Sequence, residues 1–165
     1  MNNNGKKSLA FIAKNWALIF LLVLIALFSV SGQNFFSLRN FNNILIAATT
    51  TLLLATGETF VIISGGIDLS IGFTMGFAAV SSATVMQRLY DRGAGYSELF
   101  CVVVGCLAGL LLGLIPGFVN GLLVAKFRVP PFIATLGMYG IANGLAWKIC
   151  EGFPVTFLPP LTGQI

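Results

Sequence analysis

Long apolar segments separated by short polar ones dominate this chain. A helix needs about 20 mostly apolar residues to cross the hydrocarbon core of a bilayer. Five segments approach or exceed this length, and their approximate bounds are 16–30, 44–63, 69–87, 99–125 and 132–149. We therefore predict an all-α fold, a polytopic transmembrane helix bundle of about five spans, in which residues 1–165 form a single integral-membrane region.

The composition agrees with a membrane location. The chain is 57% hydrophobic and 8% charged, whereas soluble domains average about 25% charged residues. The net charge of +4 comes from scattered Lys and Arg side chains, so nothing indicates nucleic-acid binding. Histidine is absent, and Cys101, Cys106 and Cys150 form no CxxC pair. We therefore interpret the cysteines as packing residues and expect no metal site.

The first apolar segment follows three lysines, Lys6, Lys7 and Lys14. A basic stretch before an apolar run also fits a cleaved signal peptide, but this run is long for one, so we favour an uncleaved first span. With the N-terminus inside, five basic residues face the cytoplasm and four face outside, a weak positive-inside signal. The three N-terminal lysines decide the orientation, which places the N-terminus and the link at 64–68 on the cytoplasmic side.

Two acidic residues, Glu58 and Asp68, lie in a stretch that is otherwise apolar and uncharged. A carboxylate in a bilayer core costs about 3 kcal/mol or more unless it is compensated. Only residues 64–68 separate the second and third apolar segments, which predicts a tight turn or a broken helix at membrane depth. Gly65 and Gly66 suit the end of the preceding helix because glycine adopts positive φ. Asp68 either caps the next helix at its N-terminus or acts directly in a transport cycle.

Glycine recurs at every fourth position in the segment 99–125. Such a stripe follows one helix face and lets helices approach closely in lipid, where apolar burial no longer drives association. Gly72 with Gly76, and Gly140 with Gly144, repeat the pattern once each. We predict tight helix packing at these positions, with the lining of a substrate path as the alternative. The glycines assigned to the helix break and to packing are Gly65, Gly66, Gly72, Gly105, Gly109, Gly113, Gly117 and Gly121.

Polar side chains in or beside the apolar segments are candidates for a substrate path or for gating. Asn120 and Asn143 either form interhelical hydrogen bonds or face a path for solute. Glu58 is neutral, paired or reached by water, and Lys126 and Arg128 are its candidate partners if they lie on the same side of the membrane. The complete candidate set is Glu58, Asp68, Ser70, Asn120 and Asn143.

Catalytic motifs are missing from the sequence. There is no GxxxxGK[ST] loop, so the chain does not itself hydrolyse nucleotides. GxSxG and HExxH are absent as well, and the lack of histidine removes any Ser/His/Asp arrangement. We therefore expect a protein that is not an enzyme and holds no cofactor of its own.

Three segments resemble the signatures of a known family. Gly65–Gly72 reads GGIDLSIG and closely resembles the GGIDLSVG signature of bacterial ABC sugar-importer permeases of the ribose, galactose, xylose and arabinose type. Residues 129–146 resemble the VPPFIATLG…IARGLA segment of that family, and Gly117–Val124 resembles its G-x-x-N-G-x-x-V segment. The resemblance extends from about residue 36 to residue 160 in register and order, and it is specific for the family but not for the sugar.

The resemblance implies a transmembrane subunit of the bacterial inner membrane that pairs with a second permease copy, identical or different. It implies a cytoplasmic ABC ATPase that binds ATP, and an extracytoplasmic sugar-binding protein that delivers a monosaccharide. Transport would then follow from differential stabilisation of inward- and outward-facing states, without covalent chemistry. Membrane lipid is a further expected partner.

The length of the chain departs from the family pattern. Family permeases are considerably longer, and their second half carries the loop that docks on the ATPase. The chain is therefore expected to be an N-terminal half, either a truncated piece or a half-size subunit. Three alternatives to a monosaccharide permease stay open: a permease of the same superfamily for a nucleoside or other small polar solute, a non-transporting scaffold subunit, and an ion-coupled secondary carrier with Asp68 or Glu58 as the coupling acid.

Overall fold

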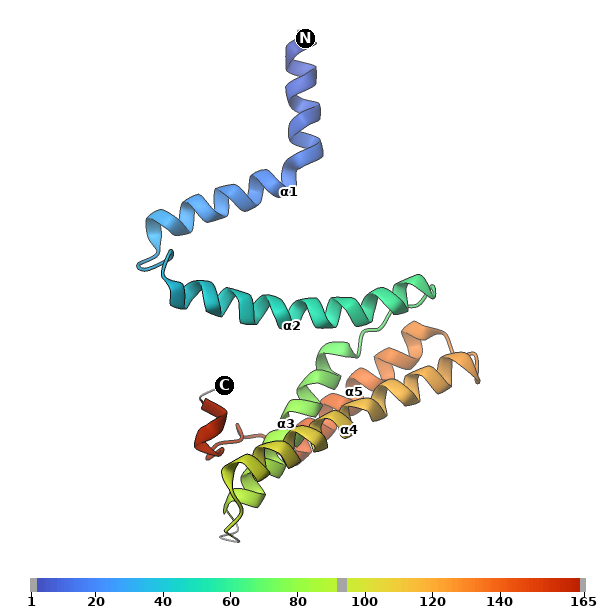
Figure 1. The fold of residues 1–165 in the computed structure, drawn as a ribbon. Coiled ribbons are helices and arrows are strands. Elements are labelled where there is room, and N and C mark those ends of the chain that lie inside the picture. Colours follow the sequence, from blue (N-terminus) through green and yellow to red (C-terminus); the bar gives the residue numbers. More distant parts are fainter. Residues whose placement is uncertain (1–2, 92–94, 164–165) are drawn as a thin grey trace. The chain divides into compact units, whose positions relative to one another are not determined.

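The computed structural model describes residues 3–91 and 95–163, and these ranges contain helices and no strand. The predicted all-α, polytopic helix bundle is therefore confirmed. Within these ranges, five α-helices and one short 3-10 helix follow one another, and Figure 1 shows their arrangement. Their bounds are α1 Asn3–Ser31, α2 Leu38–Ile63, α3 Ile71–Asp91, α4 Glu98–Ala125, α5 Pro131–Ile149 and η1 Pro160–Gly163.

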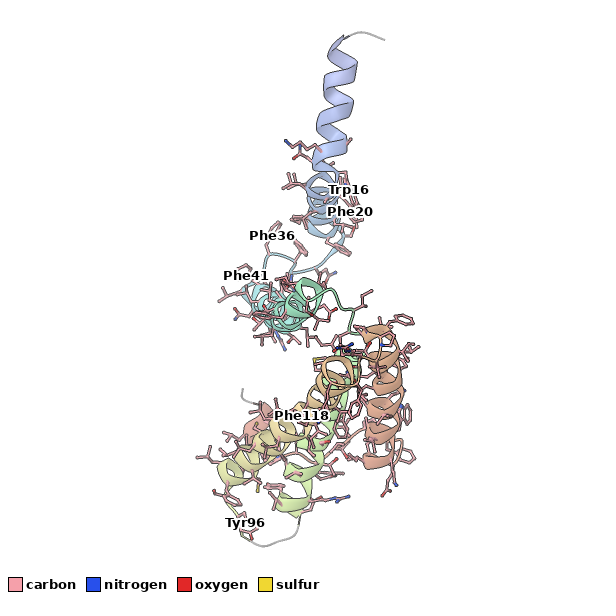
Figure 2. All side chains as sticks on the ribbon, turned by 90° about the vertical axis from the view of Figure 1, so that its right-hand side faces the viewer. Trp16, Phe20, Phe36, Phe41, Tyr96 and Phe118 are labelled. Atoms are coloured by element: carbon pink, nitrogen blue, oxygen red, sulfur yellow. The ribbon has the colours of Figure 1, made fainter. Side chains whose placement is uncertain are left out.

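Three helices of the described chain are long and apolar enough to cross a membrane. They are the part of α1 from Ala13 to Ser31, α2 and α4, with mean hydropathies of 2.1, 1.7 and 2.6. Large apolar side chains stand exposed on them, such as Trp16 on α1, Phe41 on α2 and Phe118 on α4 (Figure 2). Such an exterior suits lipid or further membrane helices. That α3 and α5 also cross the bilayer stays a prediction.

Helix bounds differ from the predicted spans mainly where helices begin. α2 begins at Leu38 and not at residue 44, because the Ser37 hydroxyl accepts a hydrogen bond from the Asn40 N–H at 3.2 Å and caps the helix. α3 begins at Ile71, after residue 69, and continues to Asp91. Hydropathy marks only the apolar part of a helix, whereas backbone hydrogen bonding carries each helix on into polar residues.

The chain divides into two compact units, Met1–Leu53 and Leu54–Ile165. In the first unit, the Phe28 and Phe35 rings stack with their centroids 6.4 Å apart. The Asn40 side-chain amide donates to the Phe35 carbonyl at 2.8 Å. These contacts fix the turn between α1 and α2.

Helices α3, α4 and α5 form the packed part of the second unit, and α3 and α4 make the most extensive contact. In Figure 1 these three helices run side by side. Cys101 has no exposed surface, and Phe77, Met86 and Met138 are almost fully buried. The core therefore lies between these helices, and the burial of Cys101 agrees with its interpretation as a packing residue.

The segment after α5 returns to the end of the bundle where α3 finishes and α4 begins. The Gln87 side-chain amide donates to the Thr156 carbonyl at 2.8 Å. The Leu161 N–H donates to a Glu98 carboxylate oxygen at 3.2 Å. Pro159, which lies between Thr156 and Leu161 in the sequence, is fully buried. The segment is thus an ordered part of the second unit.

Helix α2 ends in a Schellman motif, as the two glycines suggested. The Gly65 N–H donates to the Ile62 carbonyl and the Gly66 N–H to the Val61 carbonyl, both at 2.9 Å. Gly65 has the expected positive φ, +80°. Gly66 lies in a crowded place, because a Cβ there would lie 3.1 Å from Val61 Cγ1 and 3.5 Å from Pro131 Cβ. The break therefore holds the start of α5 close to the end of α2.

Gly65→Ala is expected to lower the free energy of unfolding by about 1–2 kcal/mol, because an L-residue is strained in the left-handed region. A Cβ at Gly65 would meet no described atom within 4 Å, so the cost is conformational alone. Thermal unfolding of the purified full-length protein in detergent measures the change. Gly72→Ala is the control, since its Cβ is equally free but its backbone is helical. Equal stability of the two variants would contradict the interpretation.

Candidate functional site

A cavity of about 310 Å³ lies where the helix break meets two other helices of the second unit. The break contributes one wall, the C-terminal half of α4 another, and the first turns of α5 the third. Each of the three segments that resemble family signatures therefore supplies part of the lining. The polar and glycine residues that matter most for its chemistry are Gly66, Asp68, Gly117, Asn120, Gly121 and Thr135.

A directional chain of hydrogen bonds connects Asp68, Ser70 and Asn120. The Ser70 N–H and the Ser70 hydroxyl both donate to Asp68 Oδ1, at 2.7 and 2.6 Å. The Asn120 amide nitrogen Nδ2 donates to Ser70 Oγ at 3.0 Å. Ser70 is 2% exposed and Asn120 is 6% exposed. A hydroxyl has one proton, so giving it to Asp68 leaves Ser70 Oγ as an acceptor and fixes Asn120 with Nδ2 toward Ser70.

The prediction that Asp68 caps α3 is wrong. The helix begins at Ile71, and Ser70 holds the cap position, with its carbonyl accepting from the Thr74 N–H at 2.8 Å. Asp68 instead accepts from the N–H two residues later, which is the Asx-turn geometry that aspartate side chains favour. The carboxylate therefore shapes the break and orients the Ser70 hydroxyl.

Glu58 lies against the same break. Its Oε1 accepts from the Asp68 N–H at 3.3 Å, so the partner that the structure gives it is a backbone amide, in place of the suggested Lys126 or Arg128. Its other oxygen, Oε2, is buried and has no hydrogen-bond partner among the described residues. The structure thus brings together the two acidic residues that are ten positions apart in the sequence.

Asn120 Oδ1 is a second buried acceptor without a partner in the described chain. A buried polar atom left unsatisfied costs about 1–3 kcal/mol, and native proteins contain few such atoms. Two of them lie at one break, on Glu58 and on Asn120. Both are acceptors, so what would satisfy them is a hydrogen-bond donor.

Thr135 is a site residue that the sequence reasoning missed. It is 3% exposed, and its hydroxyl donates to the Ile67 carbonyl at 3.2 Å. This bond joins the first turns of α5 to the break. Thr135 lies inside the family-like segment at 129–137, but its hydroxyl gave no signal because threonine is common in apolar helices.

The glycine stripe of α4 divides into two parts. A Cβ at Gly105 would collide with Met86 Cγ and approach the Ser82 carbonyl at 2.9 Å. Gly109 and Gly113 are also close to α3, whereas a Cβ at Gly117 or Gly121 would meet no described atom within 4 Å. The first part of the stripe lies against α3, and the second part lines the cavity beside Asn120.

Asn143 belongs to a different cavity. It lies with Gly72 and Gly76 in the lining of a space of about 460 Å³ between α3, α5 and the segment after α5. The structure therefore brings Glu58, Asp68 and Ser70 together with Asn120, but it does not bring Asn143 to them. A role for Asn143 in transport stays a prediction.

Comparison with known proteins identifies the class. A family model described as the permease component of the branched-chain amino acid transport system matches residues 40–154. This range includes the break, the cavity-lining part of α4 and all of α5. The chain belongs to this permease family, which agrees with the resemblance found in the sequence. It is a multi-pass protein of the bacterial inner membrane, and the side on which its N-terminus lies stays a prediction.

The individual relatives found are named as the same kind of protein, an autoinducer 2 import system permease. The chain is 36% identical over 143 residues to the autoinducer 2 import system permease protein LsrC of Yersinia pseudotuberculosis serotype O:3 (strain YPIII). The same identity relates it to LsrC of Yersinia pestis (strain Pestoides F). The aligned region covers 87% of this chain and 38% of each relative, so the chain spans less than half of their length. No solved structure matches the chain.

Proposed function

We propose that the chain forms part of the translocation path of an ATP-driven importer for a small, hydroxyl-rich solute. The observation that carries the proposal is the convergence of three family-like segments on one cavity whose lining includes Asp68 and Asn120. A monosaccharide of the ribose type is the solute class that the sequence signatures favour. Autoinducer 2 is the other candidate, because the relatives at 36% identity are named for its import.

The partners of such an importer follow from its class. A cytoplasmic ABC ATPase supplies the ATP-binding site that this sequence lacks, and an extracytoplasmic binding protein delivers the solute. A second permease copy completes the path across the membrane. ATP and the loaded binding protein then favour different conformations of the permease, and this difference drives net movement.

The test is uptake by proteoliposomes that contain the permease expressed from its complete gene, together with its ATPase. Labelled D-ribose or labelled autoinducer 2 is supplied outside the vesicles, together with the binding protein. ATP is enclosed inside the vesicles, where the ATPase is bound to the permease. We expect uptake of one of them that requires ATP and survives a protonophore. Uptake that a protonophore abolishes while ATP is present would indicate an ion-coupled carrier. A stable complex without uptake of either solute would indicate a scaffold subunit.

A further inference from the structure

A polar pocket lies in the first unit, at the turn that joins α1 to α2. Its volume is about 320 Å³, and its walls come from residues of the turn and of the first turns of α2. Both helices are long and apolar enough to cross a membrane, the first over Ala13–Ser31 and the second over Leu38–Ile63. A turn between two such spans lies at the surface of the membrane, where the lipid headgroups are.

The turn itself fixes the shape of the pocket. The Gly32 N–H donates to the Phe28 carbonyl at 2.8 Å, and the Ser37 N–H donates to the Asn34 carbonyl at 3.0 Å. Asn34 has a φ of +64°, in the left-handed region that asparagine adopts more readily than most residues. These local bonds are independent of any ligand, so the pocket is formed before a ligand binds.

The chemistry of the pocket is that of an anion site. Arg39 supplies a positive charge, and the lining contains no acidic residue. The sequence has none at all before Glu58. A guanidinium offers five N–H donors in a fork that suits phosphate oxygens. Four lining side chains take part in no hydrogen bond between described residues, and they are Gln33, Asn34, Arg39 and Asn43.

The order of these groups matches the order of the groups in a phospholipid. Gln33 and Asn34 lie in the turn, and Arg39 lies in the first turn of α2. Asn43 follows four residues later on the same helix face, about 6 Å further along the span. A phosphate bound at Arg39 would leave the outer amides for headgroup hydroxyls and would place Asn43 level with the ester carbonyls.

Exposed aromatic rings adjoin the pocket residues in the sequence. Phe36 is 80% exposed and Phe41 is 57% exposed (Figure 2). Apolar surface that is exposed beside polar groups is typical of contact with a membrane. A free phosphate ion would use only the polar groups, whereas a phospholipid would also cover the rings with its acyl chains.

We propose that this pocket binds the headgroup of an anionic phospholipid with the chemistry of phosphatidylglycerol. Arg39 holds the phosphate, and the side-chain amides hold the glycerol hydroxyls and the ester carbonyls. A phosphatidylethanolamine headgroup fits less well, because its ammonium group finds no carboxylate in residues 1–57. The site goes beyond the proposed function, since it does not depend on which solute is carried.

Native mass spectrometry of the delipidated full-length permease tests the site, with dimyristoyl phosphatidylglycerol as the added lipid. The occupancy of the first bound lipid during a titration gives its dissociation constant. Arg39→Gln removes the guanidinium, and Arg88→Gln is the control, because it removes the same charge from an exposed arginine at the end of α3. We expect Arg39→Gln to weaken binding about tenfold or more, as the loss of a charge-assisted hydrogen bond does. Arg88→Gln should leave binding unchanged.

A second variant and two competing ligands test the details. Asn43→Leu is expected to weaken binding of phosphatidylglycerol severalfold, and leucine is a good helix former, so the span is kept. Phosphatidylethanolamine with the same acyl chains should bind more weakly than phosphatidylglycerol. An excess of inorganic phosphate should not displace the lipid, because it makes no contact with the exposed rings.

Four results would overturn the proposal. Equal losses in Arg39→Gln and Arg88→Gln would mean that only overall charge matters. Equal binding of the two phospholipids would show that the headgroup is not selected, and displacement by inorganic phosphate would assign the pocket to a free anion. If the binding protein or the ATPase detaches in Arg39→Gln while phosphatidylglycerol stays bound, the turn contacts a protein partner and not a lipid.

Discussion

Gly109→Leu is expected to abolish assembly of the full-length permease. A Cβ at this position would lie 2.8 Å from Ser82 Cβ and 3.0 Å from the Ala78 carbonyl oxygen, and the latter is backbone that cannot turn aside. Overpacking of a tight contact costs about 1–3 kcal/mol for a few added methylenes, and a leucine adds more atoms than that. Since α3 and α4 form the most extensive contact of the second unit, their separation would unfold its core. Yield and monodispersity after size-exclusion chromatography measure the effect.

A matched pair of alanine variants isolates the packing contribution. Gly109→Ala and Gly117→Ala change helix propensity on the same helix by the same amount, about 1 kcal/mol in favour of the helix. Only Gly109→Ala introduces a Cβ into a contact, because Gly117 has free space. We expect Gly109→Ala to lower the melting temperature and Gly117→Ala to leave it unchanged or to raise it. Equal melting temperatures would show that the stripe does not pack against α3.

Asp68→Ala is expected to reduce solute uptake at least about tenfold, because it removes the acceptor of two hydrogen bonds that are each worth roughly 1 kcal/mol or more. Without Asp68 Oδ1, the Ser70 hydroxyl is no longer held, and Asn120 loses its fixed orientation. Uptake normalised to the amount of assembled permease measures the loss.

Asp68→Asn separates the acceptor from the charge. An asparagine side chain keeps one oxygen that can accept from the Ser70 N–H and hydroxyl, so we expect a smaller loss of uptake than with alanine. The Glu58 bond is to the backbone N–H of residue 68 and is unaffected by either substitution. Equal losses in the two variants would mean that the negative charge matters, and that the hydrogen-bonded turn does not explain the role of Asp68.

The helices and the ending of α2 can be predicted from the sequence, because each depends only on residues close together in the chain. Apolar runs predict five helices, since a segment without polar side chains satisfies its backbone internally in lipid. The ending of α2 follows from Gly65, because only glycine adopts positive φ without strain. The close approach of α3 and α4 at Gly105 and Gly109 is also what the stripe indicates.

The sequence alone indicates that Asp68 lies near the start of a helix, but it does not show that the cap position belongs to Ser70, two residues later. Aspartate is favoured both as a helix cap and in an Asx turn, and the two differ by only two residues in the chain. Tertiary structure decides between them, because Ser70 is held by Asn120 from α4, fifty positions away. The division of the glycine stripe is decided in the same way, by where α3 ends its contact with α4.

The sequence by itself therefore determined the helices, the break at Gly65 and the membership of a permease family. Tertiary structure alone decided that Asp68, Asn120 and Thr135 line one cavity, that Glu58 and Ser70 are hydrogen-bonded beside it, and that Asn143 lies in another cavity. The physical reason is the range of the interactions. Backbone hydrogen bonds and φ preferences act within a few residues, whereas a buried polar contact depends on which helices approach each other, and hydropathy carries no information about that choice.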